Sequence, residues 1–195
     1  MDALKTALRR EARAKLRLIP PAARAHAGLC IARTLQTLPL WQNARTILAF
    51  QPLPDEPDIR SLWSDGFDPD KTWVFPKIEA DQLVLYRVRA SLDFAPGSFR
   101  ILEPLGRPDD GISPASIDLA LVPGLAFDRH GGRLGRGQGF YDRLLAHPEW
   151  RGVTLGIAFL ESEQPAIPRE PHDLSLHGIL WSDGTLSGGL PTTSS

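Results

Sequence analysis

The sequence predicts an α/β fold, a single domain in which helices flank an open, mostly parallel sheet. Helix-like and strand-like segments alternate along the chain, and several of the strand-like segments are apolar throughout, as strands covered on both faces are. A chain of 195 residues can also bury a substantial core. We expect the domain to cover residues 1–184 and the polar segment 185–195 to be a disordered tail.

Two helices form the predicted N-terminal helical segment. The first covers residues 2–18 and stops before Pro20 and Pro21, and the second runs from residue 22 to residue 38 and closes at Pro39. The predicted apolar face of the first helix comprises Leu4, Leu8, Ala12 and Leu16.

Short apolar or β-branched runs bounded by turn residues are the predicted strands. They cover residues 46–50, 72–76, 83–88, 119–123, 153–159 and 178–181. A further helix is expected to begin near Gly139, after a long glycine-rich loop that follows the fourth of these strands.

Composition excludes several classes of protein. Lys plus Arg (22) nearly balance Asp plus Glu (23), so no overall positive charge favours a nucleic-acid partner. No apolar run is long enough to span a membrane, and the N-terminus is charged where a signal peptide would be apolar. The single cysteine, Cys30, excludes an intrachain disulfide. We therefore expect a cytoplasmic protein with no membrane partner.

The stretch GGRLGRGQGFYDRLL carries the strongest functional signal. Gly135, Gly137 and Gly139 alternate, so the backbone N–H groups between them can converge on one anion. Arg133 and Arg136 add positive charge and bidentate donors that suit phosphate. A Walker loop is excluded because no Lys-Ser/Thr follows the glycines, and a dinucleotide fingerprint because the third glycine comes one residue early. The stretch predicts a phosphate-binding loop.

Three other groups of charged residues each have two possible interpretations, a functional one and a purely structural one. Three acids, Asp55, Glu56 and Asp58, follow the first strand, where a substrate would arrive in an open sheet, but such turns are often only solvated. Asp142 is either a first-turn helix acid or a Mg²⁺ ligand beside a polyphosphate. A basic row on one face of the first helix is either solvated or joined by an anion, and it consists of Lys5, Arg9, Arg13 and Arg17.

The stretch VPGLAFDRHGGRLGRGQGFYDRLL resembles the signature of the 5-formyltetrahydrofolate cyclo-ligase family, also called methenyltetrahydrofolate synthetases. The segments KTALR, DEPD, VFPKI, FRILEP and PHDLSLHGI follow the order of that family, so the resemblance spans roughly residues 5–180. It implies an enzyme that uses ATP and Mg²⁺ to cyclise 5-formyltetrahydrofolate to 5,10-methenyltetrahydrofolate, with release of ADP and phosphate. The formyl oxygen would be phosphorylated and N10 would then attack the formyl carbon.

We expect a monomer that acts on small molecules. The same resemblance implies which residues bind these ligands. ATP would bind Lys5, Arg9, Arg133, Leu134, Gly135, Arg136, Gly137, Gln138, Gly139, Phe140 and Tyr141. The reduced folate would bind Gln51, Glu56, Arg136, Gly137, Gln138, Gly139 and Phe140. Asp142 and Asp173 would bind Mg²⁺, and Arg136 would be the catalytic residue that stabilises charge in phosphoryl transfer.

Three positions depart from the family pattern. Phe140 stands where tyrosine is frequent, Gln138 where lysine or glycine is frequent, and His177 where aspartate is common. These departures leave a second hypothesis open, a non-catalytic nucleotide-binding regulatory module on the same fold. An RNA-binding domain that uses the basic helix is disfavoured by the near-neutral net charge.

Overall fold

A seven-stranded sheet forms the centre of the protein in the computed structural model, which describes residues 2–64, 66–97, 101–170 and 173–190. In order along the sheet, its strands are β11 (Leu186–Gly188), β10 (Gly178–Trp181), β9 (Val153–Ala158), β6 (Leu119–Val122), β1 (Thr46–Leu48), β2 (Thr72–Glu79) and β3 (Gln82–Val88). The five inner strands pair in parallel, whereas β3 and β11 pair antiparallel at the two edges. The predicted open, mostly parallel sheet is confirmed.

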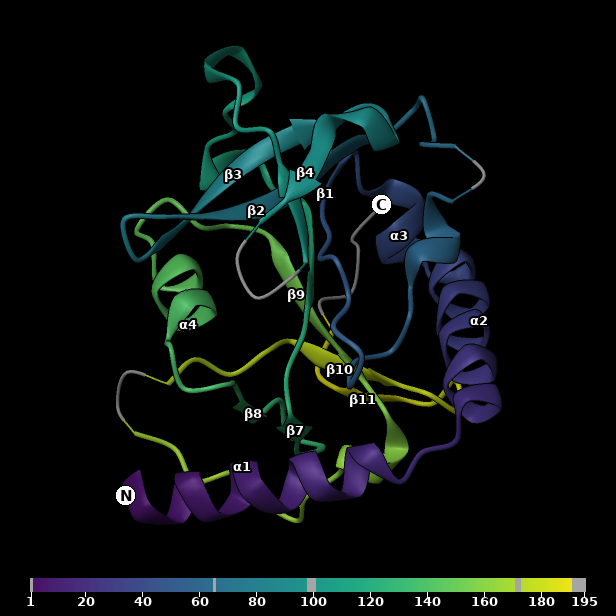
Figure 1. Ribbon diagram of the computed structural model, residues 1–195, viewed down its shortest axis with the longest axis vertical. Coiled ribbons are helices and arrows are strands. Elements are labelled where there is room, and N and C mark those ends of the chain that lie inside the picture. The colour runs from purple at the N-terminus through teal and green to yellow at the C-terminus, as the bar shows by residue number, and fades with distance from the viewer. Residues whose placement is uncertain (1, 65, 98–100, 171–172, 191–195) are drawn as a thin grey trace.

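Helices cover both faces of this sheet (Figure 1). Residues of α2 (Pro21–Thr37) and α3 (Pro39–Asn43) pack with one set of buried strand residues, and residues of α4 (Phe140–Leu145) pack with the opposite set. The N-terminal helix α1 (Asp2–Arg17) crosses below a small hairpin of β7 (Ala126–Phe127) and β8 (Arg133–Leu134), and a second hairpin joins β4 (Phe94–Pro96) to β5 (Leu102–Pro104). In the described part of the chain, no helix has the length and apolarity needed to cross a membrane.

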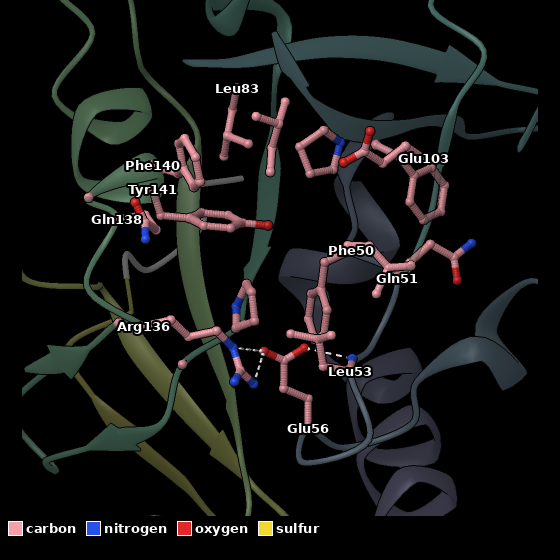
Figure 2. Close-up of a pocket in the computed structure, with 18 of the residues that line it drawn as sticks. Phe50, Gln51, Leu53, Glu56, Leu83, Glu103, Arg136, Gln138, Phe140 and Tyr141 are labelled. Carbon is pink, nitrogen blue, oxygen red and sulfur yellow. Dashed lines mark hydrogen bonds and ion pairs between the residues drawn. The ribbon is translucent and has the colours of Figure 1, made fainter. Parts of the chain in front are cut away.

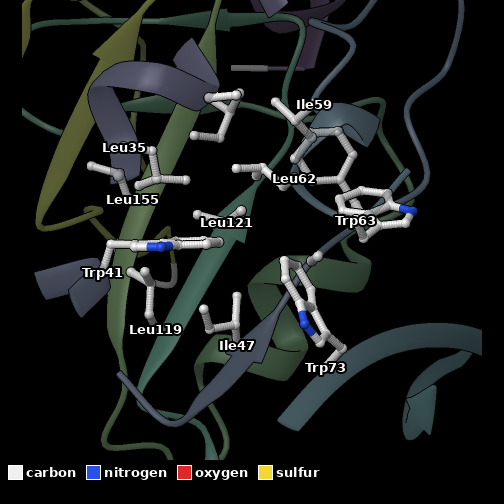
Figure 3. Packing of buried hydrophobic residues seen from close by; sticks show 14 of the residues in the cluster. Leu35, Trp41, Ile47, Ile59, Leu62, Trp63, Trp73, Leu119, Leu121 and Leu155 are labelled. Atoms are coloured by element: carbon white, nitrogen blue, oxygen red, sulfur yellow. The ribbon is translucent and has the colours of Figure 1, made fainter. Parts of the chain in front are cut away.

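Aromatic side chains fill much of the core on the α2 side (Figure 3). The ring of Trp73 packs edge-on against Trp41 and Trp63, with centroids 5.8 Å and 5.6 Å away. Edge-to-face packing of this kind is the favoured geometry for aromatic pairs. The strand β2, which carries Trp73, is thereby fixed against α3 and the loop after β1.

Both N-terminal helices have nearly the predicted bounds, but the predicted apolar face of the first helix was wrong at Leu4. Leu4 is 54% exposed, whereas Lys5 is 7% exposed and lies on the buried side of α1 with Ala12 and Leu16. A row of residues four apart drifts by about 40° per step around a helix, so Leu4 turns away while Lys5, seven positions before Ala12, stays in line. The second helix ends before Pro39, as predicted, and Pro39 is also the first residue of α3, where its missing N–H costs no hydrogen bond.

The predicted disorder of the tail from residue 185 was also wrong for its first part. Residues of β11 pair antiparallel with β10, and Leu190 packs against the core. Without this pairing β10 would present an edge of unpaired N–H and C=O groups, so backbone hydrogen bonds order a segment whose side chains bury little. Residues 191–195 lie outside the described part of the chain.

Asp128 joins the loop between β7 and β8 to the segment before β10. The side chain is 2% exposed. Its Oδ1 accepts the N–H groups of His130 (2.9 Å) and Gly132 (2.8 Å), its Oδ2 accepts that of Ile167 (2.9 Å), and Arg169 lies 3.3 Å away. Burial alone would raise the pKa of Asp128, but these N–H donors and the Arg169 charge lower it below the usual value.

We expect Asp128→Asn to reduce the free energy of unfolding by about 3 kcal/mol at pH 7, because a charged acceptor of several buried donors is lost. A lowered pKa means that the ionised form stabilises the fold above the unfolded-state pKa of about 3.9 and that this stabilisation is lost as the pH falls below it. Urea titrations at pH 7 and at pH 3.5 should therefore show the difference between wild type and variant shrinking in acid. Asp109→Asn, at an exposed position, is the control. A difference that stays constant with pH would contradict this role.

Candidate active site

A cavity of about 570 Å³ opens beyond the carboxyl ends of β1 and β6. The chain leaves β1 toward β2 on one side, whereas β6 leads to β9 on the other, so the strand order reverses between β1 and β6. Ligands of open α/β sheets bind at such switch points. The cavity wall is built by the loop after β1, by β2, β3 and β5, and by the loop that joins β8 to α4.

Most of the predicted site residues are brought together in this cavity (Figure 2). Those that line it are Gln51, Glu56, Arg133, Gly135, Arg136, Gln138, Gly139, Phe140, Tyr141 and Asp142. The predicted residues that do not line it are Lys5, Arg9, Leu134, Gly137 and Asp173. Leu134 is buried within β8, where only its backbone could serve a ligand.

The loop between β8 and α4 depends on glycine at two points. Gly137 and Gly139 have φ of +104° and +66°, which side chains disfavour. Gly139 directly precedes α4, which is only six residues long. The helix contributes less positive field than a long helix would, so the anion-binding capacity of this segment lies mainly in its own N–H groups and arginines.

Helix α1 supports the same loop from outside the cavity. Arg9 Nε donates a hydrogen bond to the carbonyl oxygen of Gly135 at 3.0 Å. Arg13 lines the cavity itself, and Arg17 is exposed. The basic row of α1 is therefore not simply a solvated face, because three of its four members point toward the protein.

Arg133 of β8 pairs with Asp142, a residue of the first turn of α4. Its Nη2 lies 2.6 Å from Asp142 Oδ1, and its side chain is 5% exposed. The guanidinium group also lies over the ring of Tyr141, 5.6 Å from the centroid. This cation–π contact and the ion pair orient both neighbours toward the cavity wall.

Arg136 reaches across the cavity to the loop after β1. Its guanidinium group contacts Asp55 at 2.5 Å and 3.1 Å. It also contacts Glu56 at 2.9 Å and 3.2 Å (Figure 2). Glu56 Oε2 accepts the N–H of Leu53 at 2.9 Å. Burial raises the pKa of Glu56, and Arg136 and the Leu53 N–H only partly oppose it. Arg136 thus links the loop between β8 and α4 to the loop after β1.

Two polar groups of the cavity wall have no hydrogen-bond partner within the described residues, the hydroxyl group of Tyr141 and Oε1 of Glu103. The Tyr141 hydroxyl points into the cavity (Figure 2). Burial raises the pKa of this phenol, with the Glu56 charge adding to the effect, so the group stays protonated and can donate.

The two predicted magnesium ligands are held by different cations. Asp142 pairs with Arg133, and Asp173 lies 2.5 Å from Lys5, which also contacts Glu170 at 3.1 Å. Over the described residues, no cluster of three or more His, Cys, Asp or Glu side chains is arranged to hold a metal ion.

His177, one of the departures from the family pattern, does not line the cavity. Its Nδ1 lies 2.8 Å from Thr154 Oγ1 and 3.1 Å from the Thr154 backbone nitrogen. It therefore joins the start of β10 to the start of β9.

Sequence reasoning missed the apolar wall and Glu103. The apolar residues that line the cavity from the loop after β1 and from β2 and β3 include Phe50, Phe75, Pro76, Ile78 and Leu83. The segments VFPKI and FRILEP contain several of these positions. Which of their side chains face the cavity depends on how the strands lie relative to the loop between β8 and α4, and this is seen only in the folded structure.

Comparisons with known proteins identify the family of the chain. The model of the 5-formyltetrahydrofolate cyclo-ligase family matches residues 1–182. A mouse 5-formyltetrahydrofolate cyclo-ligase is 29% identical over 96% of this chain and 98% of its own length, and one from Mycolicibacterium smegmatis is 31% identical over 71% and 74%. The NMR structure of the Aquifex aeolicus 5,10-methenyltetrahydrofolate synthetase superposes with a TM-score of 0.84 at 27% identity, covering 98% of this chain and 96% of that one. The chain belongs to the 5-formyltetrahydrofolate cyclo-ligase family.

Proposed function

We propose that the protein converts 5-formyltetrahydrofolate and ATP to 5,10-methenyltetrahydrofolate, ADP and phosphate. The observation that carries this proposal is the contact of Arg136 with Asp55 and Glu56, which puts the phosphate-binding loop and the acidic loop on one cavity. Relatives that align over nearly the whole chain are named for this substrate or this product. The protein would act as a monomer in the reducing cytoplasm, with which its single cysteine is compatible.

The chemistry needs positioning more than it needs a strong base. The formyl oxygen would attack the γ-phosphorus of ATP and release ADP, which turns that oxygen into a phosphate leaving group. The N10 lone pair would then attack the formyl carbon, the C–O bond would break with its electrons leaving on phosphate, and N10 would lose its proton. Both steps gain most from fixed geometry and from neutralised phosphate charge.

The loop from Arg133 to Tyr141 would bind the triphosphate through its N–H groups and arginines, with Lys5 and Arg9 supporting it from α1. Asp142 and Asp173 would hold Mg²⁺, and their carboxylate chemistry fits that ion. Because they form no three-ligand cluster within the described residues, phosphate oxygens and water would complete its coordination. When bound, Mg²⁺ would offset the negative charge of the phosphates.

Arg136 would be the catalytic residue. Its guanidinium group is shared between Asp55 and Glu56, and a phosphoryl group arriving at the loop would compete for the same donors. Glu56 and Gln51 would contact the folate from the opposite loop. Phe140 lacks the hydroxyl group of a tyrosine but keeps an aromatic face for a folate ring.

We expect Arg136→Ala to lower kcat by about 10²- to 10³-fold, because a positioned charge on the transferring phosphoryl group is lost. Incubation with 5-formyltetrahydrofolate and MgATP, followed by the absorbance of methenyltetrahydrofolate, measures this. Arg151→Ala, which removes an exposed arginine, is the matched control. Near-wild-type turnover in Arg136→Ala, with the fold confirmed by circular dichroism, would remove Arg136 from the mechanism. Wild-type protein that binds ATP but forms no product would support the regulatory module instead.

Arg9 and Arg10 are adjacent in α1 but differ in environment, which gives a paired test of the helix contribution. Arg9 bonds to the phosphate-binding loop, and Arg10 is exposed. We expect Arg9→Ala to raise the KM for ATP about 10-fold, as the loss of one charged hydrogen bond should, and Arg10→Ala to leave it unchanged. Equal KM values for ATP in the two variants would show that α1 does not position the loop.

A further inference from the structure

Glu103 is a buried carboxylate on the cavity wall to which neither the sequence nor the family resemblance gave a role. It belongs to β5, is 6% exposed and lines the cavity. Within the described residues, its Oε1 accepts no hydrogen bond. Buried polar atoms are nearly always paired in folded proteins, so an acceptor of this kind at a cavity indicates a missing partner.

The surrounding backbone is shaped to receive this carboxylate. A Cβ atom at Gly97 would lie 2.5 Å from Cγ, Cδ and Oε2 of Glu103, closer than real contacts allow. Gly97 donates its N–H to the Ile101 carbonyl oxygen at 2.8 Å, and β4 and β5 pair Ala95 with Glu103. The side chain of Glu103 therefore packs over bare backbone at the end of a hairpin, in a fixed place.

Glu56, another acidic residue that lines the cavity, differs from Glu103 in its hydrogen-bond partners. Glu56 already receives two guanidinium nitrogens and one backbone N–H. Figure 2 shows Glu56 at the Arg136 end of the cavity and Glu103 at the other end, with Phe50 between them. Both oxygen atoms of Glu56 thus already accept hydrogen bonds from the protein, whereas Oε1 of Glu103 has no donor among the described residues.

The residues that line the rest of the cavity indicate what kind of ligand could donate a hydrogen bond to Glu103. Phe50, Leu83 and Phe140 supply flat or aliphatic surface, and the Tyr141 hydroxyl is a second unpaired polar group in the same cavity. An apolar slot that ends in a carboxylate suits a flat ring with N–H groups along one edge. A reduced pterin has such an edge, formed by its 2-amino group and N3–H.

We propose that Glu103 is a specificity-determining residue that accepts hydrogen bonds from the 2-amino and N3–H edge of the reduced pterin, an inference that rests on the proposed function. The ring then lies with this edge away from Arg136. Because N5 belongs to the second ring, this placement puts N5 and its formyl group on the part of the substrate that extends toward the phosphate-binding loop, where phosphoryl transfer must occur.

Steady-state kinetics of Glu103→Ala and Glu103→Gln test this assignment. We expect Glu103→Ala to raise the KM for 5-formyltetrahydrofolate by about 10- to 100-fold, as loss of a charged hydrogen-bond acceptor should, with the KM for ATP unchanged. Glu103→Gln keeps one acceptor oxygen and should show a smaller rise. Gly97→Ala, which leaves the carboxylate but displaces it, should also raise the folate KM alone. The control is Glu161→Gln at an exposed position.

A substrate analogue in which a methyl group replaces the 2-amino group separates recognition from a merely structural role. Wild type should use it much less well than the natural substrate, and Glu103→Ala should discriminate between the two about 10-fold less. This readout stays valid if the alanine variant is unstable, because Glu103→Gln can be used in the same comparison. Full discrimination by both variants, or an unchanged folate KM in Glu103→Ala, would overturn the assignment while wild-type turnover upholds the proposed function. A wild type that neither binds nor converts the folate would overturn both.

Discussion

The site depends on the ion pairs of one arginine across the cavity. Arg136 and Glu56 are 80 positions apart in the chain, yet the guanidinium group contacts both Glu56 and the neighbouring Asp55. Glu56 is 6% exposed, so its charge would be costly without these partners. Removing one member of a buried pair usually destabilises a protein more than the pair itself stabilises it. The ion pairs of Arg136 therefore help to fix the position of the two loops relative to each other, in addition to backbone geometry.

The same pairs set the conditions for ligand binding. A phosphate group that approaches the glycine-rich loop meets Arg133, which is fixed by Asp142, and Arg136, whose donors are shared by two carboxylates. In the proposed function, phosphate binding there would exchange protein contacts for phosphate contacts and so would alter the environment of Glu56 on the proposed folate side. Such an exchange would couple the two ligands without any large movement of the sheet.

Support for the loop comes from elements that surround it. Asp128 fixes the turn before β8, Arg9 of α1 bonds to Gly135, and Lys5 of the same helix holds Asp173. The first helix is thus part of the site, even though its apolar residues pack against the β7–β8 hairpin. In contrast, the predicted contribution of a helix N-terminus is limited by the length of α4, which is six residues.

By itself, the sequence determined the fold class and the order of the elements, and it singled out the glycine-rich loop as the candidate phosphate-binding segment, because periodicity, glycine spacing and proline positions act over short distances. It also pointed to Glu56 and Arg136, but as separate features. Only the tertiary structure decided that these two residues pair, that Lys5 rather than Leu4 is buried, and that Glu103 lies over Gly97 on the cavity wall. The pairing of Arg136 with Glu56 and that of Lys5 with Asp173 join distant parts of the chain. The contact of Glu103 with Gly97 depends on the pairing of β4 with β5, so local patterns do not encode these contacts.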